Sequence, residues 1–526
     1  MAHEDNVIRT GTALHWKPKD IIGKMTLNDF LFSNDYRHIA IKGVLTSLIM
    51  LAIGGSFAMI FRTELMLPDV QILGARVYIT LMTLHGLFMV FGFLIPMTLS
   101  ITYYMIPKVL GTERLLWSWA AQASYWTIVA AAIFLIIGRP DFTWTFYAPM
   151  SLRVGDDLLW MGYVAIILVA ISEFLAGLVL LKNAFSGATK VGWGKLPLMG
   201  WGSLTVGALL VVSTFPLGFI GYGLLSDWSQ WADVAYFDPA RGGSVMTFLY
   251  VFWTYGHPAV YLPFIPALAV LYTLLPRFLG RPIWSHWSGV IAFILLMIFA
   301  MPIGPHHFQT AFTISGWYER MVQIITLFVF IPSIMHVFNW IATLWGGVIP
   351  TSAKRAIPFK FLIAAIAFLI YGGATAYLNA QISIDADFIH NTYWIPGHFH
   401  AMFLGFVAQM MVGSIYYLYP YFTGRMYHQG LANTHFWLWQ VGIFTKVTMM
   451  FYAGYAYFPR WVYDYLAIPD WKFSQFFITI AGYLIGTGFL VFIFNFAWSA
   501  KRGEAAADEP WPVKYDASID SATPAE

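Results

Sequence analysis

The stretch Asn391-Thr-Tyr-Trp-Ile-Pro-Gly-His-Phe-His-Ala-Met402 places two histidines two residues apart at the start of a long apolar run. If this run is a helix, two steps of about 100° put the imidazoles of His398 and His400 on nearly opposite faces. Rings placed in this way cannot easily bind one metal ion together, but they can hold one metal centre on each side of the helix. The alternative is that both are core residues hydrogen-bonded to their neighbours.

The composition of the 526-residue chain is typical of a membrane protein. Hydrophobic residues make up 59% of it and charged residues only 10%, fewer than a soluble domain of this length carries. We therefore predict an all-α, polytopic membrane helix bundle that forms one domain over residues 1–526, with polar termini at 1–38 and 499–526. About twelve transmembrane helices are expected, at 39–61, 77–105, 117–137, 158–181, 198–224, 245–275, 284–302, 321–346, 357–379, 394–419, 433–457 and 473–498.

The distribution of charge predicts the orientation of the bundle. Loops on the side of the N-terminus carry lysines and arginines, such as Lys354 and Arg355, whereas the opposite loops carry aspartates, such as Asp464 and Asp470. Because positively charged loops stay in the cytoplasm, both termini are expected to be cytoplasmic. The polar, basic N-terminus has no short apolar segment, so no cleaved signal peptide is expected. The net charge of +3 gives no reason to expect a nucleic-acid partner.

The chain contains no cysteine. Disulfides, iron–sulfur clusters, c-type haem attachment and thiolate copper centres are therefore excluded within it. Redox chemistry in this chain would have to use histidine ligands. Any electron carrier that needs cysteine would belong to another subunit.

Six histidines fall in the outer half of the predicted bilayer: His85, His257, His306, His307, His398 and His400. Histidines that only fill a core would not be expected to agree in depth, whereas ligands of neighbouring metal centres must. Polar residues at this depth are also costly and are usually functional. The shared depth favours metal binding over the structural alternative.

Two further motifs bring three of these histidines together. In Trp253-Thr-Tyr-Gly-His-Pro-Ala-Val-Tyr261, His257 and Tyr261 share one helical face, about 6 Å apart along the axis. In Met301-Pro-Ile-Gly-Pro-His-His-Phe308, the Gly-Pro break lets two adjacent histidines turn toward one ion. His257, His306 and His307 would form a three-imidazole site that suits copper and leaves one coordination position open.

These motifs resemble subunit I of the haem–copper oxygen reductases, the cytochrome oxidases, over nearly the whole chain. The resemblance is closest to the B-type (ba3-like) branch. The segments that carry it are Phe61-Arg-Thr-Glu-Leu65, Leu84-His-Gly-Leu-Phe88, Gly256-His-Pro-Ala-Val-Tyr261, Tyr272-Thr-Leu-Leu-Pro276, Thr326-Leu-Phe-Val-Phe-Ile-Pro-Ser333 and His390-Asn-Thr-Tyr-Trp-Ile-Pro-Gly-His-Phe-His400.

The resemblance implies two haems and one copper ion, CuB. His85 and His400 would be the axial ligands of a low-spin haem, and His398 the proximal ligand of a high-spin haem. The copper ligands would be His257, His306 and His307. In the family, the tyrosine matching Tyr261 is covalently joined to the histidine matching His257 and supplies an electron and a proton to the reaction. The alternative for Tyr261 is an ordinary core tyrosine.

The implied function is that of a terminal respiratory oxidase, which reduces dioxygen to water and couples this reaction to proton translocation. Electrons would come from cytochrome c or another soluble donor through a subunit II that carries CuA, and small accessory membrane subunits are expected. A quinol-fed oxidase is the alternative, although the position four after Arg62 is Met66 rather than an acid. The resemblance places the multi-pass protein in a prokaryotic plasma (inner) membrane. The haem type, a, b or o, is not encoded in the chain.

One proton path of the A-type branch is expected to be missing, because Ala259 and Gly74-Ala-Arg-Val77 stand where that branch has acids. The remaining path would end at Tyr261. Its candidate residues are Tyr272, Ser285, Ser333, His336 and Asn339. His336 replaces a threonine of related B-type chains, and it would either relay protons or be a packed, neutral residue.

On the outer side, Arg460 matches an arginine that pairs with haem propionates, but its usual arginine neighbour is Trp461 here. Asp385 or Asp387, together with His390, would lie near the propionates of the high-spin haem. Arg62 resembles an arginine near the low-spin haem. The alternative interpretation is that Arg62 lies at the surface and snorkels to the membrane boundary.

Two other functions are compatible with parts of the pattern. A nitric-oxide reductase on the same scaffold needs glutamates beside a non-haem iron and lacks the tyrosine at position 261, whereas no acid is expected in the central spans near this site. A haem-free transporter with twelve helices would have no visible absorption bands.

Overall fold

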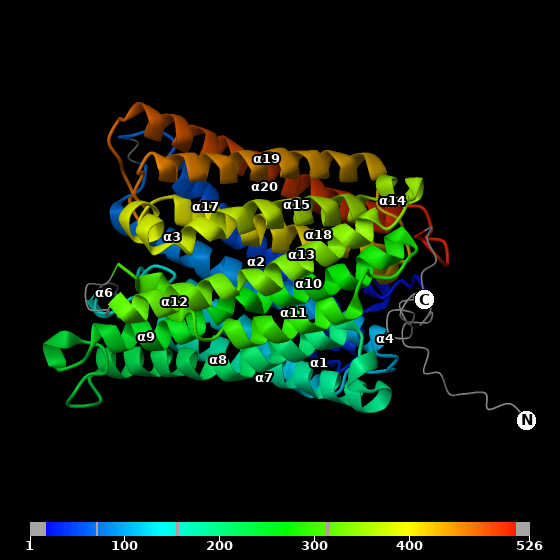
Figure 1. Cartoon of the computed structure of the whole chain (residues 1–526), viewed down its shortest axis with the longest axis horizontal. Helices are drawn as coiled ribbons and strands as arrows, with labels where there is room; N and C mark the ends of the chain where they lie inside the picture. The colour runs from blue at the N-terminus through cyan, green and yellow to red at the C-terminus, as the bar shows by residue number, and fades with distance from the viewer. Residues whose placement is uncertain (1–16, 70–71, 154–156, 311–315, 512–526) are drawn as a thin grey trace, which may run out of the picture.

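The computed structural model describes residues 17–69, 72–153, 157–310 and 316–511. Over these residues the chain is an all-α bundle without any strand, in which only three isolated bridges pair extended residues. The helices run side by side along one axis (Figure 1). The predicted all-α, polytopic fold is confirmed, while the ends of the predicted polar termini, 1–16 and 512–526, lie outside the described residues.

Ten helices of the described chain are long and apolar enough to cross a membrane. They are α2 (Tyr36–Glu64), α3 with α4 (Ala75–Val109), α5 (Ser118–Gly138), α7 (Leu159–Val191), α8 (Leu198–Ser229), α9 with α10 (Val245–Leu279), α12 with α13 (Gly316–Trp345), α15 (Ile357–Asn379), α17 with α18 (Trp394–Thr423) and α20 (Pro469–Arg502). The other two expected spans are α11 (His286–Phe299), which has only 14 residues, and α19 (Gln429–Tyr455). Helix α19 is 27 residues long but carries buried polar residues, including Lys446.

Short helices connect these spans. They are α1 (Leu27–Phe32), α6 (Met150–Arg153), α14 (Thr351–Arg355) and α16 (Ile382–Ile384), the 3₁₀ turns η1 (Ile22–Lys24), η3 (Trp193–Lys195), η4 (Pro239–Arg241) and η5 (Gly304–Phe308), and the π-helical segments η2 (Phe88–Leu94), η6 (Asp385–Ile389) and η7 (Ala401–Ala408).

Both ends of the described chain lie at the same end of the bundle. Asp20 pairs with Thr423, the last residue of α18 (Gln409–Thr423), and Ala505 pairs with Arg425 in the loop that follows, so both terminal segments contact this part of the chain. In Figure 1, α1 and the last turns of α20 lie at the end where α4 and α14 are found, opposite α3 and α9. This arrangement agrees with an even number of membrane crossings.

Two spans form the centre of the bundle. The most apolar windows of α9–α10 and α17–α18 are 94% and 89% buried, whereas those of α5 and α20 are 33% buried. Positions inside the bundle are where intramembrane polar and ionisable side chains are placed, because they then avoid the lipid. These two spans carry His257, Tyr261, His398 and His400.

Candidate functional site

Three histidines form a compact cluster. His257 lies at the junction between α9 (Val245–Gly256) and α10 (Pro258–Leu279), and His306 and His307 lie in η5. One ligand atom from each of the three rings lies within 4.8 Å of the others. The structure thus brings together the three imidazoles that the sequence predicted for a single ion. Three neutral imidazoles are a donor set that copper accepts well.

The local sequence explains why η5 reaches α9. A Cβ atom added to Gly304 would lie 2.4 Å from the carbonyl oxygen of Trp253, so only glycine permits this close approach. The His307 ring then stacks on the Trp253 indole, with 3.7 Å between ring centroids and 6° between planes. Trp253 is itself fixed because its indole nitrogen donates to the Tyr147 hydroxyl at 2.7 Å.

The polar contacts of the three rings fix their orientation. His257 Nδ1 lies 2.8 Å from His307 Nε2, and His306 Nδ1 lies 3.1 Å from the Thr326 hydroxyl. The contact between His257 and His307 requires that one of its two nitrogens carries a proton. A metal ion bound there would replace that proton. Tyr261 is buried one turn along α10, and its ring centroid lies 5.2 Å from that of His257. The predicted shared face is therefore present.

A second site is built around a large cavity. His85, in α3 (Ala75–Leu87), and His400, in α17 (Trp394–His400), line the same cavity of about 710 Å³. His85 Nδ1 lies 2.8 Å from the carbonyl oxygen of Gly54, and His400 Nδ1 lies 2.7 Å from that of Pro396. Because Nδ1 must carry the proton in such contacts, Nε2 keeps its lone pair for a metal. The volume is within the range of cofactor sites, and the ligand pair fits a six-coordinate haem.

His398 faces a different neighbour from His400. Its Nδ1 lies 3.1 Å from the carbonyl oxygen of Gly372 and 3.2 Å from the Thr375 hydroxyl, both in α15, and His398 does not line the 710 Å³ cavity. The two imidazoles thus lie on different faces of α17, as the two-residue spacing predicted. The π-helical segments η2 and η7 directly follow His85 and His400. Such segments occur frequently at functional sites.

Arg62 is not at the surface, so its predicted snorkelling alternative is wrong. The side chain is 2% exposed, lines the cavity and donates to the Tyr393 hydroxyl at 3.1 Å and to Gln475 Oε1 at 2.8 Å. Arg460 and Trp461 also line this cavity, and burial lowers the pKa of the Arg460 guanidinium. The Arg460 side chain donates to Asn391 Oδ1 at 3.4 Å, and no described residue accepts a hydrogen bond from its Nε.

The sequence prediction missed Lys446, which is 8% exposed and lines the cavity together with His85 and His400. A single lysine within the apolar span 433–457 was the signal that could have found it, because charged residues at this depth are rarely without function.

The structure separates the two candidate aspartates. Asp385 is buried, and its Oδ2 lies 2.6 Å from His390 Nδ1, whereas Asp387 is exposed. His390 Nε2 lies 3.1 Å from the carbonyl oxygen of His307. Asp385 and His390 therefore form a hydrogen-bonded link to the backbone of the three-histidine cluster.

The predicted proton-path residues are only partly connected. The Tyr272 hydroxyl lies 2.8 Å from His336 Nδ1, and the Asn339 amide lies 3.4 Å from the same hydroxyl. The Ser285 hydroxyl caps α11 and that of Ser333 donates to Val329, so both are engaged locally. The Asn339 side-chain amide donates a hydrogen bond to the backbone carbonyl oxygen of Ser285, at 2.7 Å.

One buried acid of the bundle was not singled out from the sequence. Glu173, in α7, is 2% exposed, and the Tyr255 hydroxyl donates to its two carboxyl oxygens at 3.1 and 3.0 Å. Tyr255 precedes His257 by two residues. The sequence prediction missed this contact because α7 and α9 are far apart in the chain.

A polytopic helix bundle that contains a three-imidazole cluster and a cavity lined by two further histidines is typical of a membrane redox metalloenzyme. A sequence model of the family described as "Cytochrome C and Quinol oxidase polypeptide I" matches residues 38–484. The cytochrome c oxidase subunit 1 of Synechocystis sp. is 30% identical over 491 residues, which cover 92% of this chain and 87% of that protein. The heme-copper oxidase subunit I+III of Aeropyrum pernix is 30% identical over 92% of this chain and 59% of its own length.

A solved heme-copper terminal oxidase dimer has the same fold. It aligns with a TM-score of 0.77 over 92% of this chain and 86% of that chain, at 20% sequence identity. This chain belongs to the cytochrome c and quinol oxidase polypeptide I family. It is a multi-pass membrane oxidoreductase of the haem–copper terminal oxidase type, and haem and copper are the cofactors that the family implies.

Proposed function

We propose that this chain is the catalytic subunit of a respiratory oxidase that reduces dioxygen to water, with CuB held by His257, His306 and His307. The observation that carries the proposal is the convergence of their three ligand atoms within 4.8 Å. We assign His398 to a high-spin haem opposite the copper, and His85 and His400 to a low-spin haem. The cavity shared by His85 and His400, and the different neighbours of His398, support this division.

The bound haems and copper would supply the redox chemistry, and the protein would position and insulate them. Backbone carbonyls hold His85, His398 and His400 with Nε2 free to bind iron. We propose that Tyr261, joined covalently to His257, gives an electron and a proton to the reaction. Its burial, and its ring 5.2 Å from that of His257, support this role.

We propose that protons reach Tyr261 from the side where both chain ends lie, through Tyr272, His336 and Asn339. The 2.8 Å contact between Tyr272 and His336 supports a relay by the histidine, whose Nε2 has no hydrogen-bond partner in the described part of the chain. Ser333 and Ser285 are weaker members of this path because their hydroxyls are bound locally.

For the haem propionates, Arg460 is the proposed partner on the low-spin side, and Asp385 with His390 on the high-spin side. The cavity wall position of Arg460 and the buried pair Asp385–His390 support these assignments. Exposed Asp387 is the weaker candidate.

The partners follow from the family. A subunit II that carries CuA, small accessory membrane subunits and cytochrome c or a similar soluble donor would complete the enzyme, in a prokaryotic plasma membrane with both termini cytoplasmic. The Aeropyrum pernix relative is described as a subunit I+III, which supports a multi-subunit assembly. We also propose proton pumping and membership of the B-type branch, on the motifs around His257 and Tyr272. Met66 disfavours a quinol-fed enzyme.

The experiment that tests this function is a pyridine haemochrome spectrum combined with metal analysis of the purified oxidase. We expect two haem irons and one copper ion per copy of this chain, in addition to the copper of the CuA subunit, with oxygen consumption when a reductant is supplied. Iron without copper would contradict the proposal and favour a nitric-oxide reductase. A dithionite-reduced sample without a Soret band would contradict any haem enzyme and favour a transporter.

A further inference from the structure

A cavity with several polar groups in a mostly apolar wall lies inside the bundle, away from the histidine cluster and from the path through Tyr272. It has a volume of about 40 Å³ and lies between α2, α4 (Ile95–Val109), α5 and α7. Its polar lining consists of Thr46, Ser47, Ser100, Tyr103, Ser124, Tyr125, Ser172 and Glu173. A water molecule needs roughly 10–15 Å³ and two to four polar partners, so this cavity has the room and the lining for water.

Two of these polar groups have no hydrogen-bond partner among the described residues. They are the buried hydroxyls of Ser47 and Tyr103. An unsatisfied buried hydroxyl destabilises the folded protein, and an ordered water removes that cost. The two hydroxyls thus indicate, independently of the volume, that water fills this cavity.

The carboxyl group of Glu173 forms the end of the cavity that lies deeper in the bundle. No basic side chain contacts it among the described residues, and its hydrogen-bond donor is the Tyr255 hydroxyl. An ionised carboxylate without a cation is costly in a membrane interior, so such a group is suited to hold a proton. Through Tyr255 it reaches the helix that carries His257.

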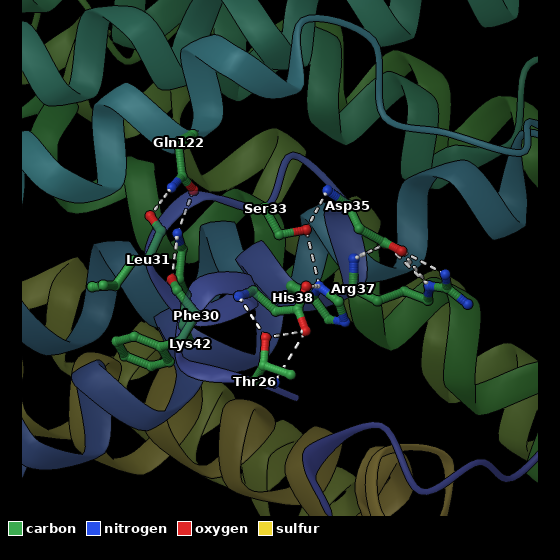
Figure 2. A network of polar contacts seen from close by, with 10 residues as sticks. Thr26, Phe30, Leu31, Ser33, Asp35, Arg37, His38, Lys42 and Gln122 are labelled. Carbon is green, nitrogen blue, oxygen red and sulfur yellow. Dashed lines mark hydrogen bonds and ion pairs between the residues drawn. The ribbon is translucent and has the colours of Figure 1, made fainter. Parts of the chain in front are cut away.

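The other end of the cavity leads toward the face where both chain ends lie. The Thr46 hydroxyl lies 2.8 Å from that of Tyr125, and Lys42 Nζ lies 4.5 Å from the centroid of the Tyr125 ring. Figure 2 shows Lys42 between the carbonyl group of Phe30 and the side chain of Gln122.

The same view shows several titratable side chains near Lys42. Asp35 is paired with Arg37, and His38 Nδ1 lies 2.9 Å from the Ser33 hydroxyl. Polar side chains therefore continue from Lys42 to the surface at the start of α2.

We propose that this cavity is a second proton-uptake compartment, filled by water from the Lys42 end and terminated by Glu173 as its proton-holding group. The inference rests on the proposed oxidase function. The acid stands on α7 and is connected to α9 through the Tyr255 hydroxyl. For each proton that a carboxyl oxygen of Glu173 accepts from cavity water, one proton leaves the same carboxyl, so the group returns to its starting state and no electron is needed.

The test compares the Glu173→Gln variant with the wild type in the complete purified oxidase. The first measurement is a reduced-minus-oxidised infrared difference spectrum in H₂O and in D₂O. We expect a carboxyl C=O band that shifts in D₂O in the wild type and is absent in the variant, while haem spectra and copper content stay unchanged.

The second measurement is proton uptake per electron in vesicles, together with turnover. We expect at least a twofold loss of proton uptake per electron in Glu173→Gln. Ser203→Ala is the matched control, because Ser203 is a buried serine of α8 that bonds only to Met199 in its own helix. An unaltered carboxyl band with unaltered proton uptake in Glu173→Gln would overturn the proposal.

If Glu173→Gln does not accumulate, Ser47→Leu provides the same test, because the larger side chain displaces water and keeps the carboxyl group. A loss of proton uptake would support the compartment, and normal uptake would overturn it.

The infrared band separates a failure of this proposal from a failure of the proposed function. If the wild-type oxidase carries its haems but reduces no oxygen, the proposed function fails, while the D₂O-sensitive band still decides whether Glu173 exchanges a proton.

Discussion

The three-histidine cluster and the cavity behind α17 are built in opposite ways. In the cluster, the imidazoles touch one another, and ligand atoms from all three lie within 4.8 Å. At the cavity, His85 and His400 are each fixed by a backbone carbonyl and face a space of about 710 Å³. The first arrangement suits one small ion and the second suits one large flat group. This difference indicates that a substitution at one site can remove its metal centre and leave the centre at the other site in place.

The largest effect is expected for His257→Ala, which removes one of three ligands from the cluster. Oxygen reduction should fall by more than the roughly 10–100-fold loss known for outer-shell partners of metal sites, because a ligand itself is removed. Metal analysis should show the loss of one copper per chain, and the low-spin haem spectrum should be retained. A variant with full copper content would contradict the assignment.

The two faces of α17 can be separated by a pair of substitutions. His400→Ala should abolish the low-spin haem absorption and keep carbon monoxide binding at the other haem. His398→Ala should abolish carbon monoxide binding and keep the low-spin spectrum. Optical spectra of the two purified variants measure both effects. The same spectral loss in both would mean that the two rings do not serve different centres.

A smaller effect is expected for Asp385→Asn. The carboxylate bonds to His390, which in turn contacts the backbone of His307, so its loss would loosen one side of the cluster. Copper affinity should fall by about 10–100-fold, as for other outer-shell partners, while both haem spectra remain. Asp387→Asn is the control, because this exposed side chain should have no effect. Equal affinity in the two variants would remove Asp385 from the site.

Helical periodicity and apolar length predicted much of this molecule. The two-residue spacing of His398 and His400 is enough to predict their opposite faces, and the Gly-Pro break before His306 is enough to predict the convergence of two adjacent histidines. These features depend on local geometry, which spacing determines. The number of membrane spans was harder to predict. Helix α11 has only 14 residues, and α19 carries buried polar residues.

The remaining features depend on contacts between distant helices, and a single sequence does not contain them. Arg62 was compatible with both the surface and the interior until its partners on α20, Gln475 and Thr479, were known. The contact between Glu173 and Tyr255 joins α7 to α9 across 82 residues. Buried polar groups form pairs across helices, so their partners become visible only in the folded bundle.

The smallest predicted effect concerns Lys446, which distinguishes the cavity from the cluster by charge. Among the described residues, the cavity wall contains three basic side chains, Arg62, Lys446 and Arg460, whereas the cluster consists of neutral rings. A cation beside a haem in a low-dielectric interior stabilises the state with one more electron. Lys446→Met should therefore lower the midpoint potential of the low-spin haem by roughly 50–150 mV, the range expected for one unit charge about 5–15 Å from the iron at an effective dielectric constant of about 20.

Spectroelectrochemical titration measures this potential without any need for turnover. Lys446→Arg is the matched control, because it keeps the charge and should keep the potential. The high-spin haem, whose ligand His398 does not line this cavity, should shift less. If Lys446→Met lost the low-spin haem, the lysine would instead be needed to bind that cofactor. An equal shift of both haems would mean that the charge acts on the whole interior, and the electrostatic separation of the two sites would then be wrong.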